Sequence, residues 1–369
     1  MSSNNKKLNL GKLKKYLWPT SKWKRGLNIV AAAVILFTTV SYGVAQWYIA
    51  KHDDEPLILG TTFVPTYAES FGLDPKDTLQ AILSDLKVKQ IRLMSYWDQI
   101  EPSPGIYDFS NLDWQFDMAG KYGAEVSLAV GLRQPRWPEC HPPQWLAPDT
   151  SKNEWQPKLY AFMSVVINRY KDNPALKTYE LENEFFMKVF GECQDFDRSR
   201  LVYELALVKK LDPSHKVIIS RSNNWVGWPV GQPTPDQFGI SVYKRVWDRT
   251  ITKRYFEYPL PAWFYAALAG GGEILTGKDM VIHELQAEPW PPTDIHQASL
   301  SEQFKSMNAK RLKDRIAYGE ATGMRNIDLW GAEWWYWLKV KQNDSSVWDV
   351  VKQAVAQAES DNRILAEKK

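Results

Sequence analysis

The sequence is poor in the residues that build metal sites and disulfide scaffolds, and it lacks the usual nucleotide-binding turns. Its 369 residues include two cysteines and five histidines, and the histidines show no metal-ligand spacing. No GxGxxG or GxxxxGK[ST] pattern occurs, which argues against a dinucleotide or nucleoside triphosphate fold. The 44% hydrophobic content excludes a disordered chain, and two cysteines exclude a small disulfide-rich domain. We therefore expect no metal ion and no other cofactor.

Acidic residues are absent from positions 1–25, which carry eight Lys or Arg. The rest of the chain has 46 − 8 = 38 basic residues against 43 acidic ones, a net charge of −5, although the whole chain is +3. Because the positive charge is confined to one short arm, nucleic acid is not an expected partner.

Charge of either sign is absent from residues 26–50. As a helix, 25 residues would span roughly 37 Å, enough for a bilayer core of about 30 Å. The preceding positive charges predict a cytoplasmic arm at 1–25, a transmembrane anchor at 26–50, and an extracytoplasmic remainder. The alternative is a signal peptide cleaved after Ala45, where Gly43, Val44 and Ala45 have the appropriate small residues. Both interpretations export the rest of the chain.

The exported part alternates apolar strand patterns with helical ones. Asp74 and Pro75 are typical of a helix start, and Ser299 with Glu302 predicts a capping box opening one helix that extends to Ile316. A last helix is expected near 347–356. Strands are expected at 57–63, 89–95, 124–131, 176–182, 216–222, 237–243, 280–285 and 326–331.

Eight such repeats predict a (β/α)8 TIM barrel over residues 51–357, followed by a charged tail at 358–369. An open doubly wound sheet is the alternative fold. In a barrel, function is expected at the segments that follow each strand.

Carboxylates stand at the ends of two predicted strands. Glu184 follows the fourth strand, and Glu284 ends the seventh. Two carboxylates that face one another can cleave a glycosidic bond, one protonating the leaving oxygen while the other attacks the anomeric carbon. The structural alternative is that such residues are solvated or paired with arginine, for example Arg92 or Arg221.

These residues resemble the clan A glycoside hydrolases, the barrel enzymes that include the cellulase family (family 5 or a neighbour). Asn183-Glu184 looks like the fourth-strand motif with the acid/base, and the segment 282–285, Ile-His-Glu-Leu, resembles the seventh-strand motif with the nucleophile Glu284. The resemblance covers roughly residues 57–357. It implies that Arg92 supports the nucleophile, that Tyr243 hydrogen-bonds it, that Trp330 floors the sugar site, and that Asn183 binds the sugar 2-hydroxyl.

The sequence departs from the clan pattern in two places. Phe185 follows Glu184 where cellulases often have proline, and the third strand ends in Gly131-Leu132-Arg133 without the histidine of many relatives. The clan is therefore better supported than any single family or substrate.

Neighbouring glutamates compete with the two chosen ones. Strand alternation would place Glu180, Glu182 and Glu184 on one face, so only the Asn-Glu dipeptide selects Glu184. Glu180 is expected to be a paired carboxylate of the barrel interior. Glu288, in the loop before Pro289, is the alternative nucleophile to Glu284.

Aromatic residues are plentiful after the predicted strands. We expect Trp97, Trp137 and Trp290 to contact sugar rings, since flat aromatic faces stack on sugars, while others, including Trp225 and Trp228, either do the same or pack under loops. Cys140 and Cys193 follow the third and fourth strands, and a disulfide between them is plausible in an exported domain, with two free thiols as the alternative.

Together these features predict a monomeric, membrane-tethered retaining glycoside hydrolase acting on an extracytoplasmic oligo- or polysaccharide. A transglycosidase and a non-catalytic glycan-binding barrel are the alternatives. The aromatic stretch 255–269 either packs as the sixth barrel helix or touches lipid.

Overall fold

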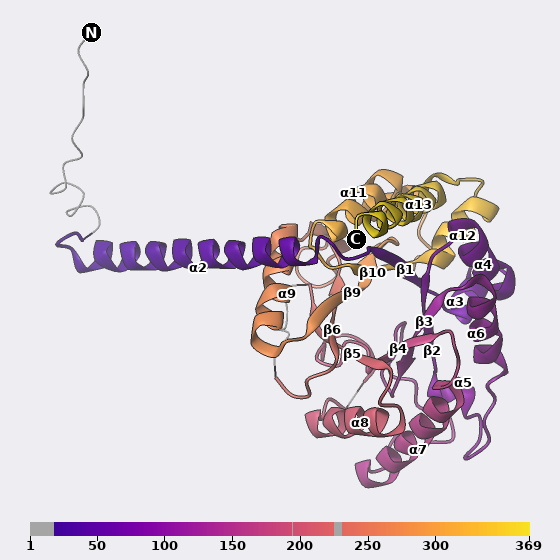
Figure 1. Cartoon of the computed structure of the whole chain (residues 1–369). Helices are drawn as coiled ribbons and strands as arrows, with labels where there is room; N and C mark the ends of the chain where they lie inside the picture. The colour runs from indigo at the N-terminus through magenta and orange to yellow at the C-terminus, as the bar shows by residue number, and fades with distance from the viewer. Residues whose placement is uncertain (1–17, 194, 225–230) are drawn as a thin grey trace.

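A computed structural model of the chain describes residues 18–193, 195–224 and 231–369. Most of the basic arm, together with Trp225 and Trp228, lies outside these residues. Two parts are visible: a barrel and a long helix that projects from its side (Figure 1).

Eight parallel strands close the barrel in the order β1-β10-β9-β6-β5-β4-β3-β2. This confirms the predicted fold, because each strand pairs with its predecessor and the last pairs with the first. The strands are β1 (Ile58–Thr62), β2 (Gln90–Met94), β3 (Glu125–Val130), β4 (Leu176–Leu181), β5 (Lys216–Asn223), β6 (Gln237–Val242), β9 (Asp279–Gln286) and β10 (Asn326–Trp330).

Helices surround the barrel and bury its apolar outer surface (Figure 1). The main ones are α4 (Pro75–Ala81) with its π-helical continuation η1 (Ile82–Leu86), α6 (Ser110–Tyr122), α7 (Lys152–Tyr170), α8 (Arg198–Leu211), α9 (Ala262–Thr276), α11 (Ala309–Glu320) and α13 (Ser346–Glu367). Shorter helices are α3 (Pro65–Ser70), α5 (Trp97–Ile100), α10 (Leu300–Ser306) and α12 (Ala332–Lys341). Asp74 caps α4 as predicted, since its carboxylate accepts a hydrogen bond from the Asp77 amide at 2.9 Å.

The helix predicted to run from Ser299 to Ile316 is two helices. Ser299 does cap α10, but Met307 has an extended backbone (φ −145°, ψ 133°) and ends it. The Asn308 side chain then accepts a hydrogen bond from the Arg311 amide at 3.0 Å and caps α11. The apolar periodicity continues across this break, so it could not reveal the new start.

The last helix is longer than expected, and residues 358–367 do not form a separate tail. Ala358 is buried, and the Asn362 side chain exchanges two hydrogen bonds of 2.8 Å with the backbone of Leu57. The charged residues after 357 therefore occupy the solvent-facing positions of a packed helix.

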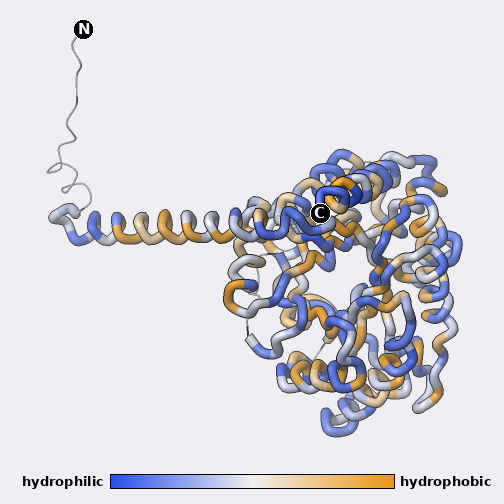
Figure 2. The backbone as a smooth tube through the Cα atoms, viewed as in Figure 1, coloured by the Kyte–Doolittle hydropathy of each residue, from blue (hydrophilic) through white to orange (hydrophobic). Residues whose placement is uncertain are grey.

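A long helix, α2 (Lys22–His52), precedes the barrel. Its most apolar 18-residue window has a mean hydropathy of 1.9 and is not buried. Figure 2 shows the projecting part as mostly hydrophobic, with hydrophilic residues at its free end. By length and composition this helix could cross a membrane, as predicted for residues 26–50.

The last turns of α2 pack on α9 and are part of the barrel surface. Ala45, Tyr48 and His52 are buried there. Gly270 permits the close approach, because a Cβ at that position would lie 2.9 Å from Cγ1 of Val44. The other face of α9 packs on the barrel through Tyr265, Ala266 and Leu268, so the helical part of the stretch 255–269 is packed rather than free.

Between β6 and α9 the chain forms a two-stranded antiparallel ribbon, β7 (Arg245–Trp247) and β8 (Tyr255–Glu257). This ribbon and the loop after β3 rise from the carboxyl ends of the barrel strands, where the sites of such barrels lie.

Candidate active site

Glu284 lies in β9 near its carboxyl end, and both of its oxygens are hydrogen-bonded. Arg92 of β2 donates to Oε1 at 2.8 Å, and the Tyr243 hydroxyl donates to Oε2 at 2.8 Å. Only 4% of the residue is exposed. Burial and the charge of Glu284 raise the pKa of Tyr243 well above its ordinary value, so the phenol stays protonated and acts as a donor. The carboxylate is therefore fixed in one orientation by two other strands.

Arg92 is itself held by the neighbouring strand. Its Nε and Nη2 donate to the two oxygens of Glu180 at 2.5 and 2.6 Å, and Nη2 also donates to Asn183 Oδ1 at 2.9 Å. Glu180 is thus the paired interior carboxylate that the sequence indicated. A two-point contact of this kind locks the guanidinium plane, which in turn aims Nη1 at Glu284.

The end of β4 departs from strand alternation. β4 ends at Leu181, and both Glu182 (φ 56°) and Glu184 (φ 44°) have left-handed backbone conformations. The expectation that Glu180, Glu182 and Glu184 share one face is therefore wrong. Left-handed backbone is uncommon for residues other than glycine and often marks a functional segment.

Glu182 turns away from the cavity and ties the loop after β3 to α8. Its carboxylate accepts hydrogen bonds from the amides of Leu132 (2.6 Å) and Arg133 (3.1 Å) and pairs with Arg200 at 2.7 Å. Glu184, in contrast, lines the same cavity as Glu284. The turn at the end of β4 thus separates a structural carboxylate from a cavity one.

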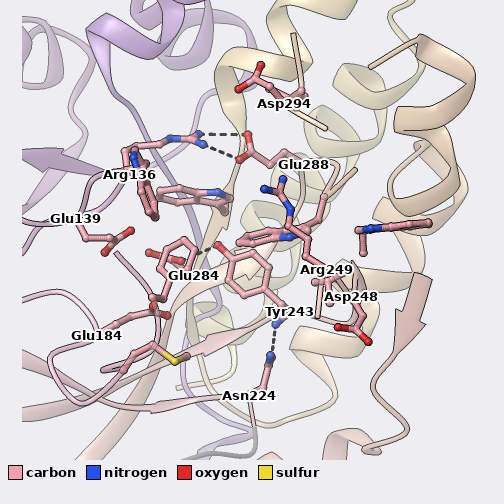
Figure 3. A pocket seen from close by; sticks show the side chains of 18 of the residues that line it. Arg136, Glu139, Glu184, Asn224, Tyr243, Asp248, Arg249, Glu284, Glu288 and Asp294 are labelled. Atoms are coloured by element: carbon pink, nitrogen blue, oxygen red, sulfur yellow. Dashed lines mark hydrogen bonds and ion pairs between the residues drawn. The ribbon is translucent and has the colours of Figure 1, made fainter. Parts of the chain in front are cut away.

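The cavity has a volume of about 1110 Å³ and opens above Glu184 and Glu284 (Figure 3). Its wall comes from the loops after β1, β3, β4, β6 and β9 together with the β7–β8 ribbon. Aromatic residues on this wall are Tyr67, Trp137, Phe190, Tyr243, Trp247, Phe256, Tyr258, Trp290 and Trp330. A concave site with aromatic walls and carboxylates at its base suits a sugar chain.

The predicted tryptophans divide into two groups. Trp137, Trp290 and Trp330 line the cavity as expected, and Trp137 is 61% exposed. Trp97 does not, because its ring is fully buried against Phe162 and its Nε1 donates to Glu101 at 2.6 Å. The prediction for Trp97 is therefore wrong. It follows its strand by three residues, but α5 turns it into the layer between barrel and helices.

Trp330 is partly covered by a residue that the sequence did not point to. The Arg136 guanidinium carbon lies 4.0 Å from the Trp330 ring centroid and 3.4 Å from that of Tyr67. Arg136 also pairs with Glu288 at 2.6 Å, as Figure 3 shows. Glu288, the alternative nucleophile, is thus engaged at the rim of the cavity. A cation between two aromatic faces is held by both electrostatics and packing.

Asn183 is also placed differently from expectation. It is buried, and among the described residues that line the cavity Glu139 appears while Asn183 does not. Asn183 Nδ2 donates to Glu139 Oε2 at 2.9 Å. Glu139 was missed because it lies nine residues after β3, in a loop with no regular pattern.

Cys140 and Cys193 form the predicted disulfide, with an S–S distance of 2.00 Å. It links the loops after β3 and β4 directly beside Glu139. His283, predicted to be a packed histidine, is buried against Ser220 Oγ at 3.0 Å, and burial lowers its pKa to about 3. The imidazole is therefore neutral and structural.

Comparison with known proteins gives partial matches in sequence and broad matches in fold. The family model for β-galactosidase, glycoside hydrolase family 42, matches residues 75–153. The β-galactosidase BgaH of Haloferax lucentense is 24% identical over 149 residues, which cover 34% of this chain and 21% of that protein. The β-galactosidase BbgII of Bifidobacterium bifidum is 30% identical over 105 residues, 24% of this chain and 15% of that protein.

Two solved structures illustrate the match in fold. A family 42 β-galactosidase from G. stearothermophilus superposes with a TM-score of 0.56 at 12% identity, covering 84% of this chain and 57% of the other. A family 5 glycoside hydrolase from Bifidobacterium longum gives the same TM-score at 12% identity, covering 83% and 80%. The predicted resemblance to the clan A glycoside hydrolases is confirmed. The chain spans only about a fifth of the length of BgaH, and structural likeness at 12% identity establishes the barrel alone.

Proposed function

We propose that this chain is a retaining glycoside hydrolase in which Glu284 is the nucleophile and Glu184 the general acid/base. The observation that carries the proposal is the fixed carboxylate of Glu284, held by Arg92 and Tyr243 at the base of a cavity that Glu184 also lines. Because the named relatives are β-galactosidases, aryl β-galactosides are the first substrates to assay.

The reaction would proceed in two steps. Glu284 attacks the anomeric carbon while Glu184 gives a proton to the glycosidic oxygen, so the leaving group departs as an alcohol and a covalent glycosyl-enzyme forms. Glu184 then takes a proton from water, which attacks the same carbon and releases Glu284. Tyr243 and Arg92 orient the nucleophile in both steps without themselves exchanging protons.

A covalent trap tests these roles. A 2-fluoro glycoside with a good leaving group should label the protein, and peptide mass analysis should place the label on Glu284. Glu284→Gln should abolish labelling and lower turnover by roughly 10⁴-fold or more, whereas Glu288→Gln should still be labelled. A label on Glu288 would reject the assignment. Glycan binding with no turnover across a broad substrate panel would instead favour the non-catalytic barrel.

The same proposal places the barrel outside the cytoplasm, tethered by an uncleaved α2. Support comes from the junction with α9: Tyr42 packs edge-on to Trp263, and the Tyr48 hydroxyl donates to Asp279 at 2.8 Å. Cleavage after Ala45 would remove Tyr42 and Val44 from this junction. Intact mass of the membrane fraction distinguishes the two, because a chain beginning at Gln46 contradicts the tether.

A further inference from the structure

The Asn183 side chain is already satisfied by protein groups at both ends of its amide. Its oxygen accepts from Arg92 at 2.9 Å, and its nitrogen donates to Glu139 at 2.9 Å. Asn183 is 2% exposed, while Glu139, beyond its nitrogen, lines the cavity together with Glu184 and Glu284. Glu139 therefore lies between Asn183 and the substrate space, as the view in Figure 3 is consistent with.

Glu139 is held firmly in this position. The Glu192 amide donates to the Pro138 carbonyl at 2.9 Å, and the next residue, Cys140, is bonded to Cys193. Gly191 presses against the Glu139 side chain, since a Cβ on Gly191 would lie 2.7 Å from Cβ of Glu139. A carboxyl group packed this tightly is positioned for one contact rather than free to sample several.

The chemistry next to the nucleophile narrows what Glu139 can contact. Arg92 bonds both Glu284 and Asn183, so the Asn183–Glu139 pair lies beside the nucleophile and thus beside the anomeric carbon that it attacks. An anomeric carbon is flanked by the ring oxygen, the glycosidic oxygen and carbon 2. Neither of those oxygens carries a hydrogen, so the hydroxyl on carbon 2 is the neighbouring group able to donate to a carboxyl oxygen.

Charge supports a neutral partner. Glu139 is buried beside Glu184 and Glu284, with Arg133 Nη2 3.5 Å away. Burial, followed by the charge of Glu184, raises the pKa of Glu139 well above its ordinary value. A carboxyl group with little charge matches a hydroxyl better than an ammonium group.

We infer that Glu139 is the residue that contacts the sugar 2-hydroxyl, with Asn183 as its positioning residue, and that the substrate is a glycoside with a free 2-hydroxyl. This inference rests on the proposed glycosidase function. It moves the contact that the resemblance implied for Asn183 to a residue of the loop after β3, where this chain departs from the clan pattern.

The test compares Glu139→Ala on two substrates, an aryl glycoside and its 2-deoxy counterpart. If Glu139 accepts from the 2-hydroxyl, the variant should lower kcat/KM for the first on the order of 10- to 100-fold and for the 2-deoxy glycoside by less than about 3-fold. Glu139→Gln keeps the side-chain shape and an acceptor oxygen, so it should restore part of the activity on the first substrate. An equal loss on both substrates, with no recovery in Glu139→Gln, overturns the inference.

A matched control is Glu192→Gln, which changes an exposed carboxylate next to the same disulfide. It should leave both rates unchanged, and thermal melting should show Glu139→Gln folded. Failure of the unmodified protein to turn over either glycoside contradicts the proposed function and this inference with it. Turnover with equal losses contradicts only the role of Glu139.

Discussion

At the base of the cavity, Glu284 is fixed by Arg92 and Tyr243, so three strands converge on one carboxylate. At the wall, Arg136 and Glu139 come from a single loop after β3, and a disulfide to the loop after β4 holds it. The base is rigid because barrel geometry imposes it, whereas the wall is rigid because side chains and one covalent bond were added to an irregular loop. Changes at the base should therefore affect folding and chemistry together, and changes at the wall should separate the two.

The largest effect is expected at the base, from Arg92→Met. Removing this fully buried guanidinium leaves Glu180 and Glu284 without their cation, which should lower the free energy of unfolding by about 3–5 kcal/mol. Chemical denaturation measures it. The matched control is Arg169→Met, which removes a half-exposed pair with Asp113 and should cost about 1 kcal/mol or less. Equal losses in the two variants would mean that the buried network has no special importance.

Replacing both Cys140 and Cys193 by serine tests the wall. The disulfide closes a long loop, so the free energy of unfolding should fall by about 2–4 kcal/mol. Activity should fall as well, because Glu139 adjoins Cys140. Denaturation and kinetics are measured on the same samples. Unchanged kcat/KM would show that the loop keeps its shape through hydrogen bonds alone.

A smaller effect concerns pH and Glu333, which lies beneath Arg136 and accepts from the Val64 amide at 2.6 Å. Burial raises its pKa to about 7, so between roughly pH 4.5 and 7 the folded state holds a proton that the unfolded state has released. Stability from this group is therefore complete at low pH and is lost as pH rises through 7.

The variant Glu333→Gln keeps an acceptor for Val64 but cannot ionise. Relative to the unmodified protein, its stability should rise between pH 5 and pH 8 by roughly 1–3 kcal/mol, seen in melting temperatures across that range. Glu257→Gln, at an exposed carboxylate, is the control and should show no such trend. A parallel pH profile for Glu333→Gln and the unmodified protein contradicts the assignment.

The smallest effect on stability, and a clear one on chemistry, is expected for Tyr243→Phe. It removes one hydrogen bond to Glu284, so kcat/KM should fall about 10- to 100-fold while the melting temperature hardly changes. Tyr318→Phe loses a comparable hydrogen bond to the Leu260 carbonyl, in the packing against α9, and should keep full activity. A large loss of stability in Tyr243→Phe would mean that the phenol is structural.

Sequence reasoning succeeded where a residue sits in or next to a strand. Glu184, Glu284, Tyr243 and Trp330 were placed because the strand pattern and the resemblance agreed on the carboxyl ends of the barrel. It failed for Trp97, because a short helix after β2 redirected the ring, and for Glu139 and Arg136, because a loop without periodicity carries no directional signal.

The sequence by itself determined the fold class, the uncharged helix before the barrel, the cysteine pair and the two carboxylates, since these depend on local pattern or on motif. Only the tertiary structure decided that Glu182 turns to Arg200 while Glu184 turns to the cavity, and that Glu139 rather than Asn183 faces the substrate. Those outcomes depend on left-handed backbone and on contacts between segments about 40 to 50 residues apart along the chain, which no local pattern encodes.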